Sequence, residues 1–319
     1  TVRGGQAGLV LEVGRHVALD EQHGLAVVVD VEQFRRQRVA TVVALALLCI
    51  EVYSHVLDLR GHSWAVTNAT ATFSNGVPML LLPPSEGKAE GGSARRPGWT
   101  PDSGAFGRRD AIASRRLEIV EALGGRGGGD GKLLGVRGDH LARAQSANSS
   151  LVGAPVLPAW QRYTGVVWDH LDPATLPATA RRRIVVVSGL LGLVRGDDPV
   201  PDYRLKMGAN LAPLGKLSTW WREDLSERLN RYAAGRTAKQ PRVIVDLLPQ
   251  EHRAAWHPDE RVRGVSIAFV DPTGQPGGHF AKAAKGELAR AILTDGLAAV
   301  DRWRHERFVI SVTTIGSGR

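Results

Sequence analysis

The chain has almost no cysteine and no long apolar run, and both absences narrow what it can be. Cys49 is the single cysteine among 319 residues, so no disulfide can form within the chain and a cysteine-based metal cluster is excluded. The longest apolar stretch, residues 39–52, is interrupted by Thr41 and Glu51 and is too short to cross a bilayer. It also lies too far from the start for a signal peptide. These features predict a cytoplasmic protein without a membrane partner.

Motifs of several common catalytic classes are missing as well. Residues 127–132 look like a phosphate-binding loop, but arginine stands at the position of its first glycine and leucine follows its lysine. Ser188 lacks the Gly-x-Ser-x-Gly frame of a hydrolase nucleophile. His252 and His257 are five positions apart, unlike a zinc-binding helix, and are expected at the surface or as capping residues. No compact cluster of histidines and carboxylates is visible, which disfavours direct iron binding, and no metal or cofactor is predicted.

A strong excess of basic residues points to a polyanionic partner. The chain has 41 Lys and Arg against 32 Asp and Glu, a formal net charge of +9, and a pI of about 10.2. Such a balance favours nucleic acid over a membrane surface. The alternative is that an arginine-rich genome encodes basic proteins whatever their partners.

The basic residues are unevenly distributed along the chain. Residues 1–76 hold six Arg, no Lys and seven acidic residues, and therefore carry −1, so the remaining residues carry +10. The first segment shows short Val, Ala and Leu runs without clear caps. Val77 and Met79 could both serve as start sites. We expect 1–76 to be a poorly structured extension, from a mis-assigned start or a dispensable appendage. The alternative is a genuine small N-terminal domain.

From residue 77 onward, strand and helix patterns alternate. Continuous apolar or β-branched runs are typical of buried strands, and apolar residues three or four apart are typical of helices. Strands are expected at residues 79–82, 184–187, 243–248, 265–270 and 308–312. Helices are expected at 111–123, within 133–144, at 219–232 and at 286–299, and a loop at 90–110. Alternating strands and helices predict an α/β or α+β domain over residues 77–319, with a mixed central sheet flanked by helices.

Six short motifs in this region resemble, in the same order, those of the YaaA family of peroxide-stress proteins. They occupy residues 80–88, 163–166, 187–195, 201–208, 220–221 and 280–286. The third departs from the family pattern at Leu191, where an aromatic residue is common, and residues 247–251 also depart from it. The resemblance implies a cytosolic protein that binds DNA and protects against hydrogen peroxide by lowering free iron. It also implies a basic cleft and a helix-hairpin-helix element.

The helix-hairpin-helix expectation falls on residues 135–138, Gly-Val-Arg-Gly, followed by a helical pattern. A helix N-terminus offers unpaired N–H groups to a phosphate, and glycines allow close approach. Lys132 and Arg137 are then the phosphate partners. The usual spacing has one residue between the glycines and this chain has two, so an ordinary loop-to-helix turn is the alternative.

Further cations are expected to contact nucleic acid. Arg204 and Lys206 share a face if their segment is extended, unless they pair with Asp197, Asp198 or Asp202. Lys282 and Lys285 are three apart and share a face if they lie on a helix. Lys88 follows the first strand, at an edge where ligands gather in α/β sheets. We expect Arg204, Lys206, Lys282 and Lys285 to line one surface.

An enzyme remains the alternative to a DNA-binding protein. Ser85, Glu86, Ser188 and Tyr203, with Arg204, could form a pocket of convergent polar groups for a phosphate-bearing or nucleotide-like small molecule. No catalytic residue is assigned from the sequence.

Overall fold

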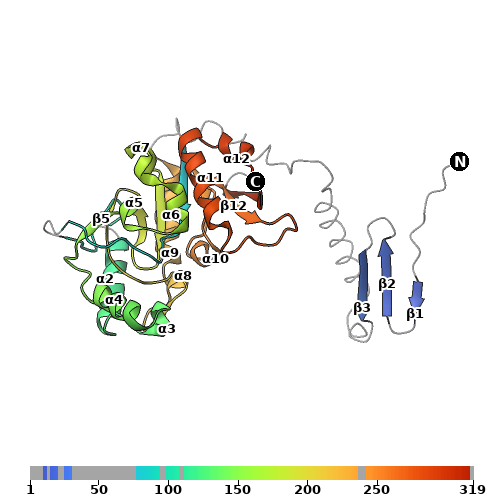
Figure 1. Cartoon of the computed structure of the whole chain (residues 1–319). Coiled ribbons are helices and arrows are strands. Elements are labelled where there is room, and N and C mark those ends of the chain that lie inside the picture. Colours follow the sequence, from blue (N-terminus) through green and yellow to red (C-terminus); the bar gives the residue numbers. More distant parts are fainter. Residues whose placement is uncertain are drawn as a thin grey trace. The chain divides into compact units, whose positions relative to one another are not determined.

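The computed structural model describes residues 10–12, 15–20, 25–30, 77–93, 98–107, 111–235 and 242–316, and for the first three ranges we consider the backbone alone. The chain divides into two compact units, Thr1–Trp64 and Ala65–Arg319, and each is described by itself (Figure 1). In the first unit β1 (Val10–Glu12), β2 (Arg15–Asp20) and β3 (Leu25–Asp30) form an antiparallel sheet. That residues 1–76 are a poorly structured, dispensable extension stays a prediction.

A six-stranded mixed sheet forms the centre of the second unit. Its order is β13-β12-β11-β4-β6-β7, and the four inner strands are parallel while β7 and β13 pair antiparallel at the two edges. The strands are β4 (Val77–Leu82), β6 (Ile184–Ser188), β7 (Gly192–Arg195), β11 (Arg242–Asp246), β12 (Arg263–Val270) and β13 (Val309–Gly316). The mixed α/β fold predicted from the sequence is therefore confirmed.

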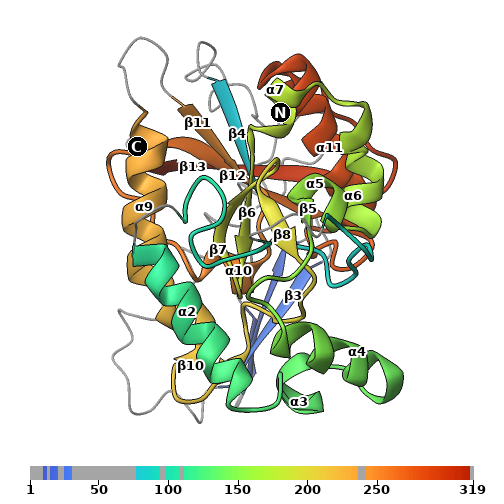
Figure 2. The same ribbon diagram turned by 90° about the vertical axis from the view of Figure 1, so that its left-hand side faces the viewer.

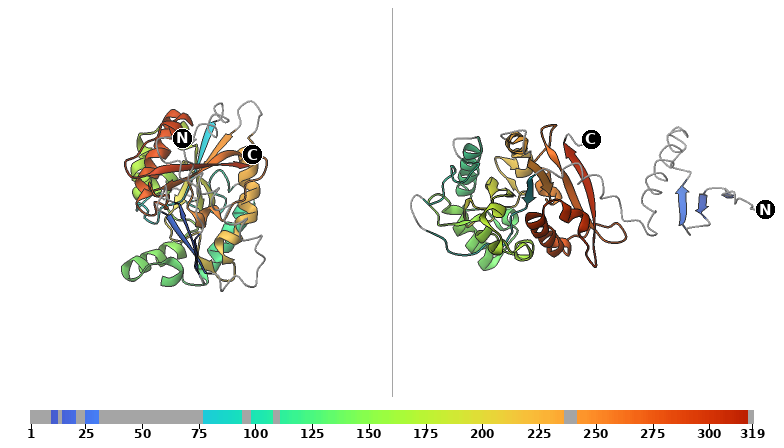
Figure 3. Two further views of the ribbon diagram at one scale, coloured as in Figure 1. Left: turned by 90° about the vertical axis from the view of Figure 1, so that its right-hand side faces the viewer. Right: turned by 90° about the horizontal axis from the view of Figure 1, so that it is seen from above.

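Helices cover both faces of this sheet at its centre, which explains why β4 and all of β6 but its last residue are apolar. Figures 2 and 3 show α2 and α9 on one side of the sheet and α6 and α11 on the other. The longer helices are α2 (Ala111–Gly124), α4 (Gly138–Ser149), α9 (Arg222–Ala234) and α11 (Ala281–Asp295). The shorter ones are α3 (Gly131–Leu134), α5 (Ala159–Arg162), α6 (Val166–Leu171), η3 (Pro173–Thr175), α7 (Ala178–Arg181), α8 (Leu217–Trp220), α10 (Gln250–Arg253) and α12 (Ala298–Arg302).

Two small ribbons complete the second unit. They pair β5 (Val156–Pro158) with β8 (Pro199–Pro201) and β9 (Asn210–Leu211) with β10 (Gly215–Lys216). No helix within the described ranges is long and apolar enough to span a membrane.

The expected strands and most expected helices are present, with ends shifted by a few residues. The helix expected at 286–299 is present, but its predicted bounds were wrong, since α11 starts at Ala281 and stops at Asp295, before Gly296 with φ 77°. Gly286, taken as the start of this helix, lies inside it. A Cβ there would stand 2.4 Å from the Val167 carbonyl oxygen, so glycine lets α6 and α11 approach closely.

Candidate functional site

The carboxyl ends of the parallel strands bring the polar motifs to one edge of the sheet. β4 runs into the turn with Ser85, Glu86 and Lys88, and β6 ends at Ser188. Because parallel strands end at the same edge, this arrangement follows directly from the topology. Ser85 fixes the turn, since its Oγ donates to the Gly87 carbonyl and accepts a hydrogen bond from the Thr164 N–H at 2.9 Å.

The side chains around Arg204 and Lys206 alternate between core and surface as in an extended chain, which is the condition under which these two cations were expected to share a face. Tyr203, Leu205 and Met207 are buried, while Arg204 and Lys206 remain partly exposed. The two cations share one partner from far along the chain. Glu86 Oε2 lies 2.8 Å from Arg204 Nη2, and Glu86 Oε1 lies 3.1 Å from Lys206 Nζ.

The partner of this pair was not predicted. Asp197 and Asp198, two of the acids considered, instead lie beside Arg195. Burial acts to raise the pKa of the Glu86 carboxyl, but the hydrogen bonds and charges of Lys206 and Arg204 outweigh it and hold that pKa below its usual value. Glu86 is therefore ionised near neutral pH and forms ion pairs with both cations.

A chain of three hydroxyl groups lies behind the cations. Tyr203 Oη is 2.7 Å from Ser188 Oγ and 3.0 Å from Tyr163 Oη, and the Leu191 N–H donates to Ser188 Oγ at 3.1 Å. Burial raises the pKa of Tyr203 to about 12 and that of Tyr163 well above 10. Both tyrosines therefore stay neutral phenols, and the chain holds the Tyr203 ring in one orientation.

Lys88 lies over that ring. Its Nζ is 4.1 Å from the Tyr203 ring centroid and 5.7 Å from that of Tyr163, and it donates a hydrogen bond to the Ser85 carbonyl at 3.0 Å. Burial lowers the pKa of the Lys88 amine to about 7, with Arg204 adding to the effect and Asp202 opposing it. This amine therefore loses its proton more readily than an exposed lysine does.

Where a helix-hairpin-helix was expected, the chain forms a short helix, a three-residue turn and a longer helix, which we call the hairpin. That it is a DNA-binding helix-hairpin-helix stays a prediction. Asp130 caps α3 by accepting the Leu133 N–H at 2.8 Å, and α3 ends at Gly135 in the left-handed region, with φ 66°. Lys132 and Arg137 are exposed on either side of the turn. The structure therefore contains the two helices and the turn, and their contact with DNA stays a prediction.

The hairpin and the segment at 203–207 are joined by specific contacts. Arg204 Nε donates to the Leu134 carbonyl at 3.0 Å, and a Cβ on Gly135 would stand 3.2 Å from Lys206 Nζ. Asn148 of α4 bonds both the N–H and the carbonyl of Arg204, at 2.9 Å each. Four of the predicted cations, Lys132, Arg137, Arg204 and Lys206, thus belong to one connected substructure.

Lys282 and Lys285 lie on the first turns of α11. Lys282 is exposed, whereas the Lys285 amine is largely buried and donates to the Leu247 carbonyl at 2.7 Å. Burial lowers the pKa of Lys285 to about 8, against the attraction of Asp246. That this pair lines one surface with Arg204 and Lys206 stays a prediction.

His252 was expected at the surface or as a cap, and that expectation was wrong. The ring is buried, its Nδ1 donates to the Val187 carbonyl at 2.8 Å, and its Nε2 lies 3.4 Å from Glu251 Oε1. The short helix α10 turns this side chain inward beneath the end of β6, so His252 ties the two elements together.

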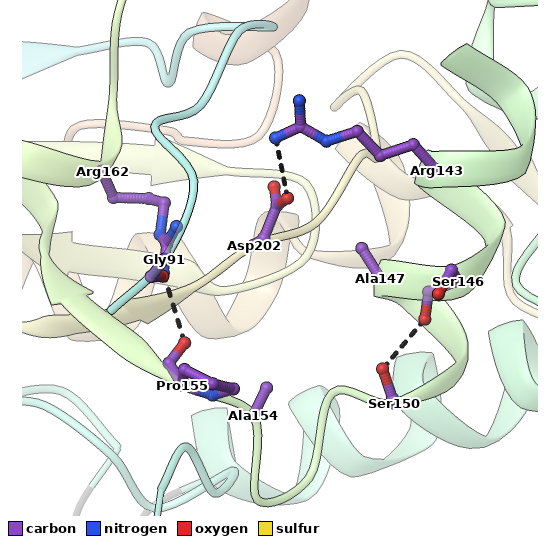
Figure 4. A pocket seen from close by; sticks show the side chains of 9 residues that line it. All are labelled: Gly91, Arg143, Ser146, Ala147, Ser150, Ala154, Pro155, Arg162 and Asp202. Atoms are coloured by element: carbon purple, nitrogen blue, oxygen red, sulfur yellow. Dashed lines mark hydrogen bonds and ion pairs between the residues drawn. The ribbon is translucent and has the colours of Figure 1, made fainter. Parts of the chain in front are cut away.

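A cavity of about 320 Å³ lies beside α4 (Figure 4). It is lined by Gly91, Arg143, Ser146, Ala147, Ser150, Ala154, Pro155, Arg162 and Asp202. Arg143 pairs with Asp202 at 3.1 Å and with Glu90 at 2.7 Å. The Arg162 guanidinium donates to backbone carbonyls, including those of Gly91 and Pro155. Both guanidinium groups are therefore already engaged within the protein.

The sequence is similar to those of known proteins over about two thirds of the chain. Residues 131–308 match the family model described as Peroxide stress protein YaaA. The chain is 36% identical over 229 residues to a UPF0246 protein from Streptomyces coelicolor, covering 69% of this chain and 84% of that protein. It is 32% identical over 223 residues to a UPF0246 protein from Corynebacterium glutamicum, covering 67% and 84% respectively. The chain belongs to the YaaA family of peroxide stress proteins.

Within the YaaA family match lie the hairpin, the segment at 203–207 and α11, whereas the turn with Lys88 precedes residue 131. Several residues that build this site were not predicted. Arg116 is buried and donates to the carbonyls of Pro101, Ser103, Leu191 and Leu193 at 2.7–3.0 Å. It thereby secures the turn that follows Ser188. An arginine on an apolar helix face was the signal available in the sequence.

Proposed function

We propose that this protein binds DNA through its phosphates at the hairpin, and that it limits free iron in cells under hydrogen peroxide stress. The observation that carries DNA binding is the contact of Arg204 and Lys206 with the α3–α4 hairpin. Two exposed cations lie on the hairpin and two more pack against it, and we infer that the four share one basic surface, which would suit a phosphate backbone rather than a base sequence. We call Lys132, Arg137, Arg204 and Lys206 the hairpin surface.

Glu86 competes with phosphate for this surface. Its carboxylate bonds both Arg204 and Lys206, as a phosphate oxygen would. DNA binding at these two cations therefore requires that Glu86 be displaced or share them. This gives the proposal a test in which two substitutions act in opposite directions.

The experiment compares Lys206→Ala with Glu86→Gln in titrations of a labelled duplex at several salt concentrations. Lys206→Ala should weaken binding about equally for unrelated sequences and lower the salt slope by about one. Glu86→Gln should tighten binding roughly threefold or more, because both cations are released for phosphate. Lys216→Ala, an exposed lysine on β10, is the matched control and should leave affinity unchanged. Equal affinities for all four proteins, with intact folding, would contradict the proposal.

The iron part of the proposal rests on the family and needs a cellular test. Cells lacking the gene should hold more chelatable iron after peroxide treatment than cells carrying it. Expression of the Lys206→Ala variant then asks whether the two parts are linked. Equal levels of chelatable iron with and without the gene would contradict the iron part of the proposal. The proposal of DNA binding would not be affected by that result.

A second candidate function is an enzyme acting on a phosphate-bearing small molecule at the same edge of the sheet. The observation that favours it is Lys88, because a buried amine with a depressed pKa is typical of lysines that act as bases or nucleophiles. A lysine that served only to attract phosphate would remain exposed and charged.

A further inference from the structure

Lys88 is arranged differently from the cations of the hairpin surface. Its side chain enters the protein between the turn after β4 and the rings of Tyr163 and Tyr203. In the described part of the chain no carboxylate forms an ion pair with its amine, and the hydrogen-bond acceptor it has is the Ser85 carbonyl. The residue as a whole keeps some exposure to solvent.

The surroundings hold the amine in place. Lys88 also forms an isolated bridge with Tyr163, which joins the backbones of the two segments. Tyr203, whose ring lies under the amine, is held by hydroxyl bonds to Ser188 and Tyr163. The amine is fixed over an aromatic face, and Glu86, two residues before Lys88 in the same turn, holds Arg204 and Lys206. Lys88 is therefore a nucleophile positioned near the cations for which we propose phosphate binding.

We propose that Lys88 condenses with an aldehyde carried by a phosphate-bearing substrate, forming an imine, while Arg204 and Lys206 hold the phosphate. This inference rests on the second candidate function and names its chemistry and substrate class. The aldehyde can belong to a free sugar phosphate or to a base-free deoxyribose within a DNA strand. Both present a carbonyl carbon a few bonds from a phosphate.

The step is balanced without a co-reactant. The uncharged amine attacks the carbonyl carbon, a C–N bond forms, and one amine hydrogen moves to the carbonyl oxygen to give a carbinolamine. The C–O bond then breaks, and the oxygen leaves as water with the second amine hydrogen. A carbon–nitrogen double bond remains between Lys88 and the substrate.

Tyr203 is a positioning residue in this scheme, because it acts through the placement of the Lys88 amine. Tyr203→Phe keeps the ring and removes the bonds to Ser188 and Tyr163. It should slow imine formation severalfold while the pH at half-maximal rate still follows the Lys88 amine. Loss of the reaction together with loss of cooperative unfolding would mean that the hydroxyl chain serves folding alone.

The test is reductive trapping with cyanoborohydride, followed by peptide mass mapping. One arm uses glyceraldehyde 3-phosphate and a second uses a duplex with one abasic site. Lys88 should carry the adduct in at least one arm, and Lys88→Arg should reduce total adduct at least tenfold. Lys216→Arg is the control and should leave it unchanged, and thermal melts show whether each variant folds.

The arms separate the two substrate sources and separate this inference from DNA binding. If only the small aldehyde is trapped, the substrate is a free sugar phosphate. If only the abasic duplex is trapped, the substrate is DNA. Binding of an intact duplex, measured in parallel, reports on the hairpin surface independently. No adduct in either arm, or adducts spread over other lysines of the wild-type protein, would overturn the inference.

Discussion

At the residue scale, the arrangement of Lys88 has a cost in stability as well as a chemical use. Its folded-state pKa is depressed from 10.5 to about 7 by burial. Between these two pH values the unfolded chain binds more protons at this residue than the folded one, so stability rises with pH across the window. Below about pH 7 both states are charged and the full penalty is present. Burial is the main cause of this penalty. Arg204 and Arg162 add to it, whereas Asp202 and Glu86 reduce it.

We therefore expect Lys88→Met to stabilise the protein by about 1–3 kcal/mol at pH 7, since methionine packs on an aromatic ring without a buried charge. The difference in the free energy of unfolding between this variant and wild type should shrink toward zero as the pH approaches 10.5. Urea denaturation at pH 6, 7, 9 and 10 measures this difference. A variant that is less stable than wild type at every pH would show that Lys88 serves structure instead of function.

At the element scale, Gly135 couples the shape of the hairpin to the position of Lys206. It ends α3 in the left-handed region, and a Cβ there would stand 3.2 Å from Lys206 Nζ and 3.4 Å from its Cε. Gly153, with φ 82°, has the same kind of backbone but open space around the position of a Cβ. Alanine at either glycine would strain the backbone, but only alanine at Gly135 would also displace Lys206. Comparing the two substitutions therefore distinguishes the two effects.

We expect Gly135→Ala and Gly153→Ala each to destabilise the protein by about 1 kcal/mol, because both force alanine into the left-handed region. Gly135→Ala alone should also weaken duplex binding, since it pushes Lys206 away from the hairpin. Thermal melts and duplex titrations measure the two effects. If both variants bind DNA like wild type, the hairpin does not position Lys206 for phosphate.

At the scale of the whole molecule, β4 explains where the chain can be shortened. It lies between β11 and β6, so the first strand among the described residues of this unit is an inner strand of its sheet. Val77, its first residue, already pairs with Arg242. Removal of residues beyond this point would break the sheet, whereas removal of residues 1–76 leaves all six strands.

We expect residues 77–319 to unfold cooperatively within about 3 °C of the full chain, since a shift of that size corresponds to less than about 1 kcal/mol. The shortened chain should also bind duplex with the same salt slope, because the net charge of +10 lies after residue 76. Calorimetry and titration measure the two properties. Loss of the cooperative transition would make residues 1–76 part of the fold.

Local patterns in the sequence were sufficient for the strands and most helices. Residues 80–82 and 184–187 are apolar because both faces of the sheet are covered, and that requirement is visible in any short window. The alternation of Tyr203 to Met207 likewise follows from the two faces of an extended chain. Such features depend on neighbours in sequence, so the sequence by itself determined them.

Tertiary structure alone decided which distant groups meet. Glu86 pairs with Arg204, 118 positions away, and Asn148 bonds the same residue from 56 positions away. The burial of Lys88 depends on Tyr163 and Tyr203, and glycine at 286 depends on the approach of α6. Each of these depends on how strands and helices pack in space. A short window of sequence does not contain that packing. The packing in space decided both the lowered pKa of Lys88 and the partner of Arg204.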